Sequence, residues 1–407
     1  MLIVQKYGGT SVADAERILK AADKIAGDYL KNNHMVIVLS AQGDTTDILL
    51  EKAGEISKTP SKRELDALLS TGEQQSAALM AIALKERGLP AISLNARQAG
   101  IFSTSEHGCA KIVSINPERI RAELEKRNIV VITGFQGTTE QGEITTLGRG
   151  ASDTTAIALA AALSADLCEI YTDVPGIFTA DPRTVKDALK YKEVCYDEIL
   201  ELSSMGASVL HSRSVELAKK FGVEFSVKSS GAECSSTQIK ENSDIEKKVV
   251  SGITADRNVC KISLLKVKHG CVPMVMRRLA ANNIVVDIVT HGAGDRYDSL
   301  SFSVPAKDCG RMLEILNEHR GECFGVEIAA QENLAKLSVI GAGVAYDTTI
   351  AAAFYETLLK EGIKLYLLSL SSIKISALVA QDDVSRAVIS LHTRFKDEGK
   401  LSPQVGI

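Results

Sequence analysis

Long apolar runs are missing from this sequence, and their absence argues against a membrane-spanning protein. The longest uninterrupted apolar stretch, residues 156–163, is far shorter than the roughly 18 residues that a membrane-spanning helix needs. Residues 1–6 also lack the basic and then apolar layout of a secretory signal peptide. We therefore expect a cytoplasmic protein.

An excess of positive charge is missing as well, and so is tryptophan. Lys and Arg number 47 against 51 Asp and Glu, which gives a formal net charge of -4 spread without blocks. Such a chain has no basic surface to attract nucleic acid or anionic lipid. The nine Phe and nine Tyr form no stripe on which bases would stack. We therefore set aside nucleic acid and membranes as partners.

The cysteines form no metal-binding pattern. The sequence contains no C-x-x-C pair and no His near a Cys at zinc spacing, so no metal site is expected. In the reducing cytosol, free and buried thiols are the better interpretation. It applies to all eight cysteines, which are Cys109, Cys168, Cys195, Cys234, Cys260, Cys271, Cys309 and Cys323.

The 407 residues are 45% hydrophobic, and a length of this order indicates two or three domains. Up to about residue 245, short apolar strands alternate with amphipathic helices, such as the helix expected over residues 14–30. This alternation is typical of a doubly wound, parallel α/β sheet. The expected strands are residues 2–5, 35–39, 91–94, 129–133, 167–171 and 223–227.

The loops that follow four of these strands are the expected place for a ligand, because ligands of parallel α/β sheets bind beyond the carboxyl ends of the strands. The four loops are rich in Gly, Ser and Thr. They are residues 6–11, 40–46, 134–137 and 172–176.

The pattern changes after a polar segment at residues 234–248, which we interpret as a linker. Two units then follow, each in the order strand, helix, strand, strand, helix. Ferredoxin-like units of this kind leave sheet edges free and commonly associate side by side, so they indicate assembly or small-ligand sensing. The expected elements are residues 259–265, 271–282, 284–289, 300–304 and 308–319, and then 335–340, 348–360, 363–369, 373–380 and 382–394. The expected domains are residues 1–245, 250–330 and 334–407.

Two glycine-bearing segments have the character of anion sites. Residues 6–11, Lys-Tyr-Gly-Gly-Thr-Ser, lead from a strand into a helix, so backbone N–H groups can face a phosphate. A tight turn beside a solvated lysine is the alternative. In residues 147–155, Ser152 can cap the next helix and Asp153 then lies in its first turn. Capping does not explain Arg149 between two glycines, where a guanidinium is well placed for a carboxylate or phosphate.

Three further segments are less specific. Residues 69–75 interrupt a helical pattern with Ser-Thr-Gly, and Glu73 there can meet an ammonium group or be an ordinary solvated residue. Residues 172–183 form a turn-rich loop, in which Asp173 can meet a ribose or metal and Arg183 a phosphate, although a plain Pro-Gly turn is equally consistent. Residues 341–346 imitate a dinucleotide fingerprint without its third glycine, and we interpret them as a loop. The sequence contains no P-loop, no G-x-S-x-G and no H-E-x-x-H.

Together the motifs resemble the amino-acid kinase superfamily, and most closely the aspartokinases, over essentially the whole chain. The two C-terminal units are similar to the paired ACT domains through which these enzymes sense amino acids. The resemblance implies an α/β, amino-acid-kinase-like doubly wound sheet followed by two ferredoxin-like ACT domains. The matching segments follow the family's order and are residues 6–11, 40–46, 72–73, 148–153, 172–177 and 179–183.

The resemblance also implies transfer of the γ-phosphoryl group of ATP to the side-chain carboxylate of L-aspartate, at the start of lysine, threonine and methionine synthesis. That carboxylate, with a pKa of about 3.9, is already ionised at neutral pH, so it needs no general base. The site needs positive charge aimed at the transferring group instead. Lys6 is the residue expected to supply this charge, with Mg²⁺ arriving on ATP.

Residue by residue, the resemblance assigns four groups of side chains. Lys6 and Asp153 would be catalytic, with Asp153 ordering the cations. The aspartate site would comprise Ser40, Thr46, Glu73, Arg149 and Ser152. The nucleotide site would comprise Lys6, Tyr7, Gly8, Gly9, Thr172, Asp173, Phe178 and Arg183. An effector site would include Gly270, Asp287, His291 and Val344.

The chain departs from its relatives at several of these places. Ser208 stands where many relatives carry a lysine near the ATP phosphates. His269 replaces the proline of the usual Lys-Pro-Gly turn, and Val285 and Lys364 replace asparagines that grip an effector. Lysine or threonine as an effector is therefore a hypothesis. A homodimer joined through ACT edges is the expected assembly.

Two other functions remain open. One is a related kinase that acts on glutamate, acetylglutamate or a nucleoside monophosphate, and the paired ACT units argue against it. The other is a catalytically inactive sensor that binds an amino acid through the ACT pair. The presence of Lys6, Arg149 and Asp153 argues against the sensor.

Overall fold

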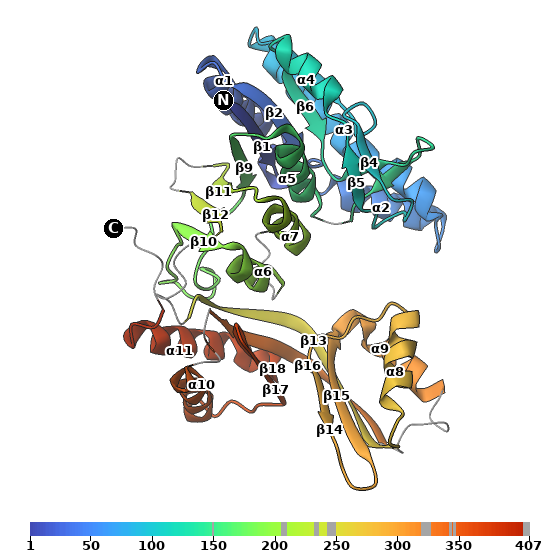
Figure 1. The fold of residues 1–407 in the computed structure, drawn as a ribbon, viewed down its shortest axis with the longest axis vertical. Coiled ribbons are helices and arrows are strands. Elements are labelled where there is room, and N and C mark those ends of the chain that lie inside the picture. Colours follow the sequence, from blue (N-terminus) through green and yellow to red (C-terminus); the bar gives the residue numbers. More distant parts are fainter. Residues whose placement is uncertain are drawn as a thin grey trace.

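The computed structural model describes residues 1–148, 150–204, 210–231, 236–241, 250–318, 327–341, 344 and 347–401. Figure 1 shows two bodies, an upper one built around an eight-stranded sheet and a lower one built around a six-stranded sheet. We call these the large sheet and the C-terminal sheet.

The large sheet has the strand order β10-β12-β11-β9-β1-β2-β6-β3, with β1 near its centre. The strands are β1 (Leu2–Tyr7), β2 (His34–Leu39), β3 (Ala91–Leu94), β6 (Ile129–Thr133), β9 (Leu167–Thr172), β10 (Glu193–Cys195), β11 (Phe225–Ser229) and β12 (Thr237–Lys240). Every pairing is parallel except that of β11 with β12, which is antiparallel. The expectation of a linker over residues 234–248 was therefore wrong for the residues of β12. This strand is short and has polar residues on both sides, so the sequence pattern did not indicate it.

Helices cover both faces of the large sheet. α1 (Ala15–Leu30) and α3 (Lys62–Glu86) pack on one face, against a core that includes Ile3, Tyr7 and Met35. α4 (Glu118–Glu125), α5 (Ser152–Leu163), α6 (Tyr196–Ser204) and α7 (Ser212–Phe221) contribute to the core on the other face. Each wholly buried aliphatic side chain in these layers contributes about 1.5–3 kcal/mol.

Helix α3 runs unbroken through the segment that was expected to interrupt it. Ser, Thr and Gly each lower helix stability by at most about 1 kcal/mol relative to alanine. Burial of Leu69, Ala77, Met80 and Leu84 along the same helix outweighs that cost. Glu73 therefore lies in the middle of a regular helix.

A small sheet, a 3₁₀ helix and helix α2 also belong to this body, and the sequence pattern did not predict them. The small sheet has the order β5-β4-β7-β8. Strands of three or four residues are too short to show an alternating pattern. The elements are β4 (Ile101–Ser103), β5 (Ile112–Ile115), β7 (Gln136–Thr138), β8 (Ile144–Thr146), the 3₁₀ helix η1 (Gly9–Val12) and α2 (Thr45–Ile56).

The two C-terminal units merge into one sheet with the order β14-β15-β13-β16-β18-β17. The first repeat contains β13 (Gly252–Val267), α8 (Val272–Ala281), β14 (Val289–Gly292), β15 (Asp298–Pro305) and α9 (Ala306–Glu318). The second repeat contains β16 (Glu327–Ile340), α10 (Thr348–Lys360), β17 (Leu367–Ser371), β18 (Lys374–Ala380), the 3₁₀ helix η2 (Gln381–Asp383) and α11 (Val384–Asp397). Their central strands, β13 and β16, pair antiparallel, so this edge of each repeat is used within the chain.

Two expectations for this region were wrong. The strand expected over residues 284–289 begins only at Val289, where the regular pairing with β15 starts, although the backbones of Asp287 and Ile288 already bond to Ser303. Cys260 and Cys309 form a disulfide between β13 and α9 instead of remaining free thiols. Their sequence separation of 49 residues hides the close packing of this strand and helix. Cys109, Cys168 and Cys195 are free.

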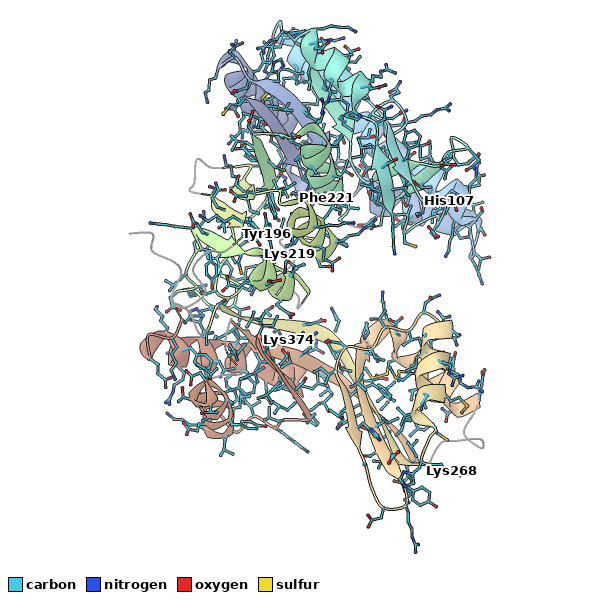
Figure 2. The ribbon with its side chains drawn as sticks, viewed as in Figure 1. His107, Tyr196, Lys219, Phe221, Lys268 and Lys374 are labelled. Carbon is cyan, nitrogen blue, oxygen red and sulfur yellow. A yellow bond between two sulfur atoms is a disulfide. The ribbon has the colours of Figure 1, made fainter. Side chains whose placement is uncertain are left out.

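The two bodies meet through charged as well as apolar contacts. Lys374 at the start of β18 forms an ion pair with Glu201 of α6, with 3.0 Å between Nζ and Oε2. Figure 2 shows Lys374 on the side of the C-terminal body that faces the large sheet. Within the described part of the chain, we find no helix with the length and apolar character needed to cross a bilayer.

Candidate active site

The carboxyl ends of four parallel strands meet at one edge of the large sheet. β9, β1, β2 and β6 are consecutive in the sheet and pair in parallel. The four loops that the sequence singled out begin at these strand ends or just beyond them. The structure thus brings together, at a single edge, segments that are far apart in the sequence, as the strand-end rule leads us to expect.

Lys6 and Asp153 form a buried ion pair at this edge. The Lys6 Nζ lies 2.7 Å from the Asp153 Oδ1, and the two side chains are 11% and 8% exposed. Successive side chains of a strand point to opposite faces, so Lys6 lies on the face covered by α5, while Tyr7 points into the α1 and α3 layer. Asp153 is the second residue of α5, where the helix dipole favours a carboxylate.

The Tyr7 ring does not join this pair. It is 1% exposed and stacks on the ring of Tyr171, with 4.7 Å between the ring centroids. Its hydroxyl donates a 3.1 Å hydrogen bond to the side-chain oxygen of Gln5. Only the backbone of Tyr7 therefore remains at the strand end, where its carbonyl accepts a hydrogen bond from the Ser40 N–H.

The two glycines after β1 allow a close approach of backbone segments. A Cβ on Gly9 would lie 2.6 Å from the Ala41 carbonyl oxygen, which is closer than carbon and oxygen can pack. A Cβ on Gly8 would lie 3.4 Å from the Lys6 Nζ. The loop after β1 therefore rests against the loop after β2, with the lysine ammonium beside it.

Glu73 presents a buried carboxylate to the same pair of loops. Its side chain is on α3, the residue is 3% exposed, and Oε1 accepts a 3.1 Å hydrogen bond from the Ala41 N–H. Its Oε2 is also buried and has no hydrogen-bond partner among the described residues. Burial raises the pKa of Glu73 to about 7, although hydrogen bonds from the backbone and Gln136 oppose the shift. A cationic group near Oε2 would lower this pKa again.

Ser152 reaches the carboxyl end of β6. A Cβ on Gly134 would lie 2.6 Å from the Ser152 Oγ, so the glycine makes room for this hydroxyl. The expectation that Ser152 caps α5 was wrong, because Ala151 is the N-cap residue and Ser152 is the first residue of the helix. The side chain of Ser152 is consequently free of a capping role.

The other predicted site residues have separate surroundings. Thr46 is the second residue of α2. The Thr172 hydroxyl donates to the Asp173 carboxylate at 3.1 Å. Phe178 is half-buried and forms an antiparallel bridge with Lys190. The Arg183 guanidinium is 88% exposed and bound to Asp181, 3.0 Å away, and Arg149 and Ser208 lie outside the described residues.

Sequence reasoning missed a buried carboxylate that organises the loop before α5. Asp66 of α3 is 1% exposed and accepts hydrogen bonds from the Thr146 N–H, the Thr146 hydroxyl and the Gly108 N–H, at 3.0, 2.6 and 3.0 Å. The His107 Nδ1 lies 2.8 Å away, and Figure 2 shows His107 at the outer end of this body. Asp66 precedes Glu73 by two helical turns, a spacing that places both on one face of α3.

Two further residues were also missed. Arg213 of α7 donates hydrogen bonds to the Leu147 and Ala110 carbonyl oxygens, at 2.9 and 3.0 Å. Ser11, within the first motif, has a buried hydroxyl without a hydrogen-bond partner among the described residues. The first motif contained Ser11, but nothing in the sequence marked its hydroxyl as buried.

Comparison with known proteins gives the family. Residues 1–229 match the model of the amino acid kinase family, and residues 337–395 match that of an ACT domain. Aspartokinase 2 of Bacillus subtilis is 43% identical over 398 residues, which span 97% of this chain and 98% of that protein. The chain belongs to the aspartokinase family. The fold class is thereby confirmed.

Two solved structures of an aspartokinase are similar over nearly the whole chain. Escherichia coli aspartokinase III in complex with aspartate and ADP, in the R-state, is 25% identical, covers 97% of this chain and 100% of that chain, and has a TM-score of 0.83. The same enzyme in complex with lysine and aspartate, in the T-state, is 25% identical, covers 96% and 99%, and has a TM-score of 0.75. As a member of this family, the present chain uses ATP to phosphorylate the side-chain carboxylate of L-aspartate. This reaction is the first step of lysine, threonine and methionine synthesis.

The residues that the family resemblance assigned to an effector lie in both repeats: Gly270, Asp287 and His291 in the first, and Val344 in the second. Gly270 lies in the turn before α8, with a φ of +82° that favours glycine. The neighbouring His269 and the β14 residue His291 both approach the buried Asp298 carboxylate, at 3.1 and 3.4 Å. Val344 belongs to the separate core of the second repeat, and Asp287 pairs with Lys336 of β16.

Proposed function

We propose that Lys6 and Asp153 carry the phosphoryl transfer of this aspartokinase at the carboxyl edge of the large sheet, and that Glu73 binds the substrate beside them. The observation that carries the proposal is the buried Lys6–Asp153 ion pair beside the glycine loop. An ammonium group held in a site of low dielectric stabilises negative charge on a transferring phosphoryl group more strongly than one in water does. The aspartate substrate is the nucleophile and needs no base, since its carboxylate is ionised at neutral pH.

At the aspartate end, Glu73 is proposed to receive the substrate's ammonium group. Its buried Oε2 has no partner among the described residues, and burial raises its pKa to about 7. Ser40, Thr46 and Ser152 are proposed to add hydrogen bonds, and Arg149 to bind a substrate carboxylate. A substrate held at both ends would present its side-chain carboxylate towards Lys6.

At the nucleotide end, the backbone of Gly8 and Gly9, with Thr172, Asp173, Phe178 and Arg183, is proposed to hold ATP. Mg²⁺ is usually bound through one or two carboxylates together with substrate phosphates. Asp153 offers one such carboxylate, and the described residues include no group of three or more His, Cys, Asp or Glu that would hold a metal unaided. Mg²⁺ is proposed to enter on ATP, where it would neutralise phosphate charge, and Asp153 would be its protein partner.

Replacement of Lys6 by methionine tests the proposal. Lys6→Met removes the charge and keeps the apolar stem, so kcat should fall by roughly 10²–10³ with the KM for aspartate nearly unchanged. Lys20→Met, which removes an exposed lysine paired with Glu16 on α1, is the matched control and should leave kcat unchanged. A kcat for Lys6→Met within about threefold of wild type would remove Lys6 from the mechanism.

We further propose lysine as an effector, a homodimer joined through the C-terminal sheet, and a cytoplasmic location. The lysine-bound structure of Escherichia coli aspartokinase III supports the first point. The outer strands β14 and β17 of the C-terminal sheet support the second, since within the described chain each pairs on one side only.

A further inference from the structure

The loop between β9 and β10 packs against the second repeat. Ala180 and Val185, from this loop, belong to the same buried core as Leu391 and Phe395 of α11. Figure 1 shows α11 on the side of the C-terminal body nearest β10 and α6. The loop that contains the proposed nucleotide residues Phe178 and Arg183 therefore packs partly against the second repeat of the C-terminal body.

The hydroxyl, the N–H and the carbonyl of Thr179 all form hydrogen bonds that hold this loop in place. The residue is wholly buried, and its hydroxyl lies 3.0 Å from the Nε2 of His392 on α11. The same hydroxyl accepts a 3.0 Å hydrogen bond from the Leu189 N–H. The Thr179 N–H donates to the Leu189 carbonyl at 2.9 Å, and the Thr179 carbonyl accepts from the Ile253 N–H of β13 at 2.8 Å.

His392 is placed to hold the threonine hydroxyl in one position. It is 0% exposed, and burial lowers its pKa, so the ring is neutral at pH 7. At the rim, Lys396 from the next turn of α11 forms an ion pair with Asp187 of the loop. One helix therefore grips the loop at two points, one buried and one exposed.

Phe178 is set by the same arrangement. It forms an antiparallel bridge with Lys190, next to the Leu189 that bonds Thr179. Phe178 is bonded directly to Thr179, whose hydroxyl is held against α11. Any displacement of Thr179 would move Phe178 with it.

We propose that His392 is a positioning residue for nucleotide binding, which acts through the Thr179 hydroxyl to hold Phe178 and Arg183 in place. ATP affinity would then depend on the packing of α11, and a change in the second repeat would reach the nucleotide before the aspartate. This inference rests on the proposed function, in which Phe178 and Arg183 hold ATP.

The test compares kinetic constants and ADP affinity in six variants of the full chain. Loss of one buried hydrogen bond typically corresponds to a roughly three- to tenfold change in an equilibrium constant. Thr179→Val and His392→Leu should each raise the KM for ATP, and the Kd for ADP measured by calorimetry, by about that factor. The kcat and the KM for aspartate should stay within about twofold. The double variant should be no weaker than the weaker single variant, because both remove one interaction.

His392→Gln is the rescue variant, since the glutamine amide can reach the position of the Nε2, and it should bind ADP within about twofold of wild type. Thr357→Val is the matched control. Thr357 is a buried threonine in α10 of the same repeat, and among the described residues its hydroxyl bonds only its own helix, at the Ala353 carbonyl. It should lower stability without changing ADP affinity.

An unchanged Kd for ADP in folded Thr179→Val, or the same rise in Thr357→Val, would overturn the inference. If His392→Leu fails to fold, Thr179→Val and His392→Gln decide the matter. Phe178→Ala separates the two layers of the argument. A raised Kd in Phe178→Ala beside an unchanged Kd in Thr179→Val would refute the positioning role alone. An unchanged Kd in both would also refute the nucleotide assignment of the loop.

Discussion

At the scale of single residues, Glu73 carries the clearest electrostatic signal in the site. A carboxyl group whose burial raises its pKa to about 7 is half protonated at neutral pH in the free enzyme. Only the ionised form can pair with an ammonium group. Substrate binding and proton release from Glu73 are therefore linked.

This linkage predicts a pH-dependent KM for aspartate. Below pH 7, Glu73 is increasingly protonated before substrate binds, so the KM should rise by about tenfold per pH unit, and above pH 8 it should be constant. Glu73→Gln should raise the KM for aspartate above pH 8 far more than the KM for ATP, and should remove the rise below pH 7. Steady-state kinetics from pH 6 to 9 measure both effects.

The control for this series is Glu86→Gln, which removes an exposed acid at the end of the same helix. It should behave as wild type at every pH. If Glu73→Gln keeps the wild-type pH profile, or weakens ATP and aspartate equally, the assignment of Glu73 to the ammonium group is wrong.

At the scale of elements, α3 connects two regions of the site: it carries the Glu73 carboxylate, and it contacts the segment that leads into α5. Glu73 faces the loop after β2, while Asp66, two turns earlier, holds the end of β8 through Thr146. The segment that follows contains the predicted substrate residue Arg149. One helix thereby contacts both the loop after β2 and the end of β8.

Asp66→Asn should test this function of α3. The amide NH₂ would face N–H groups whose hydrogen bonds the carboxylate accepts in the wild type. An unsatisfied buried group of this kind costs about 1–3 kcal/mol of stability, so Tm should fall by several degrees. Displacement of the loop should lower kcat/KM for aspartate by roughly ten- to a hundredfold. Calorimetry and steady-state kinetics measure the two effects.

Glu64→Gln supplies the comparison, because Glu64 is an exposed acid in the first turn of α3 that pairs only with Arg63 among the described residues. This variant should match wild type in Tm and rate. Equal Tm and equal kcat/KM in Asp66→Asn would show that the carboxylate does not position the loop.

Elements with strong periodicity could be predicted from the sequence, and short or context-dependent ones could not. The helix expected over residues 348–360 and the strand over residues 129–133 have the predicted bounds. The strands of the small sheet and β12 have too few residues for a periodic signal. The Ser-Thr-Gly of α3 misled the local interpretation because tertiary burial overrides propensity.

The candidate site divides in the same way. Lys6, Asp153 and the glycine loop could be predicted, since they form contiguous motifs beside strand ends. Asp66 and Arg213 could not, because each is a lone charged residue that becomes meaningful only when distant segments pack around it. The contact between Thr179 and His392 spans 213 residues of sequence, and no local pattern announces it.

At the scale of the whole molecule, the C-terminal sheet is continuous, and its body contacts the body of the large sheet in two places. The β13–β16 pairing joins both repeats into one sheet, and the second repeat meets the catalytic body through Lys374 and through the loop that contains Thr179. A ligand that shifted one repeat against the other would therefore strain contacts that reach the nucleotide loop.

This arrangement predicts inhibition by lysine that acts mainly on ATP. Saturating lysine should raise the KM for ATP more than the KM for aspartate, and Thr179→Val should weaken the response, since the contact with α11 transmits it. Initial rates with and without lysine and threonine measure the effect. A change of less than about twofold with both amino acids at saturation would contradict feedback through this sheet.

The central claim is that Lys6, at the carboxyl edge of the large sheet, promotes phosphoryl transfer from ATP to aspartate. The most direct measurement is acyl-phosphate formation with ATP and Mg²⁺, trapped as the hydroxamate, for wild type and Lys6→Met. L-Aspartate, L-glutamate and N-acetyl-L-glutamate serve as acceptors in parallel. We expect product from wild type with aspartate alone, and roughly a hundredfold less from Lys6→Met. Equal product from the two proteins, or product only with another acid, would contradict the claim.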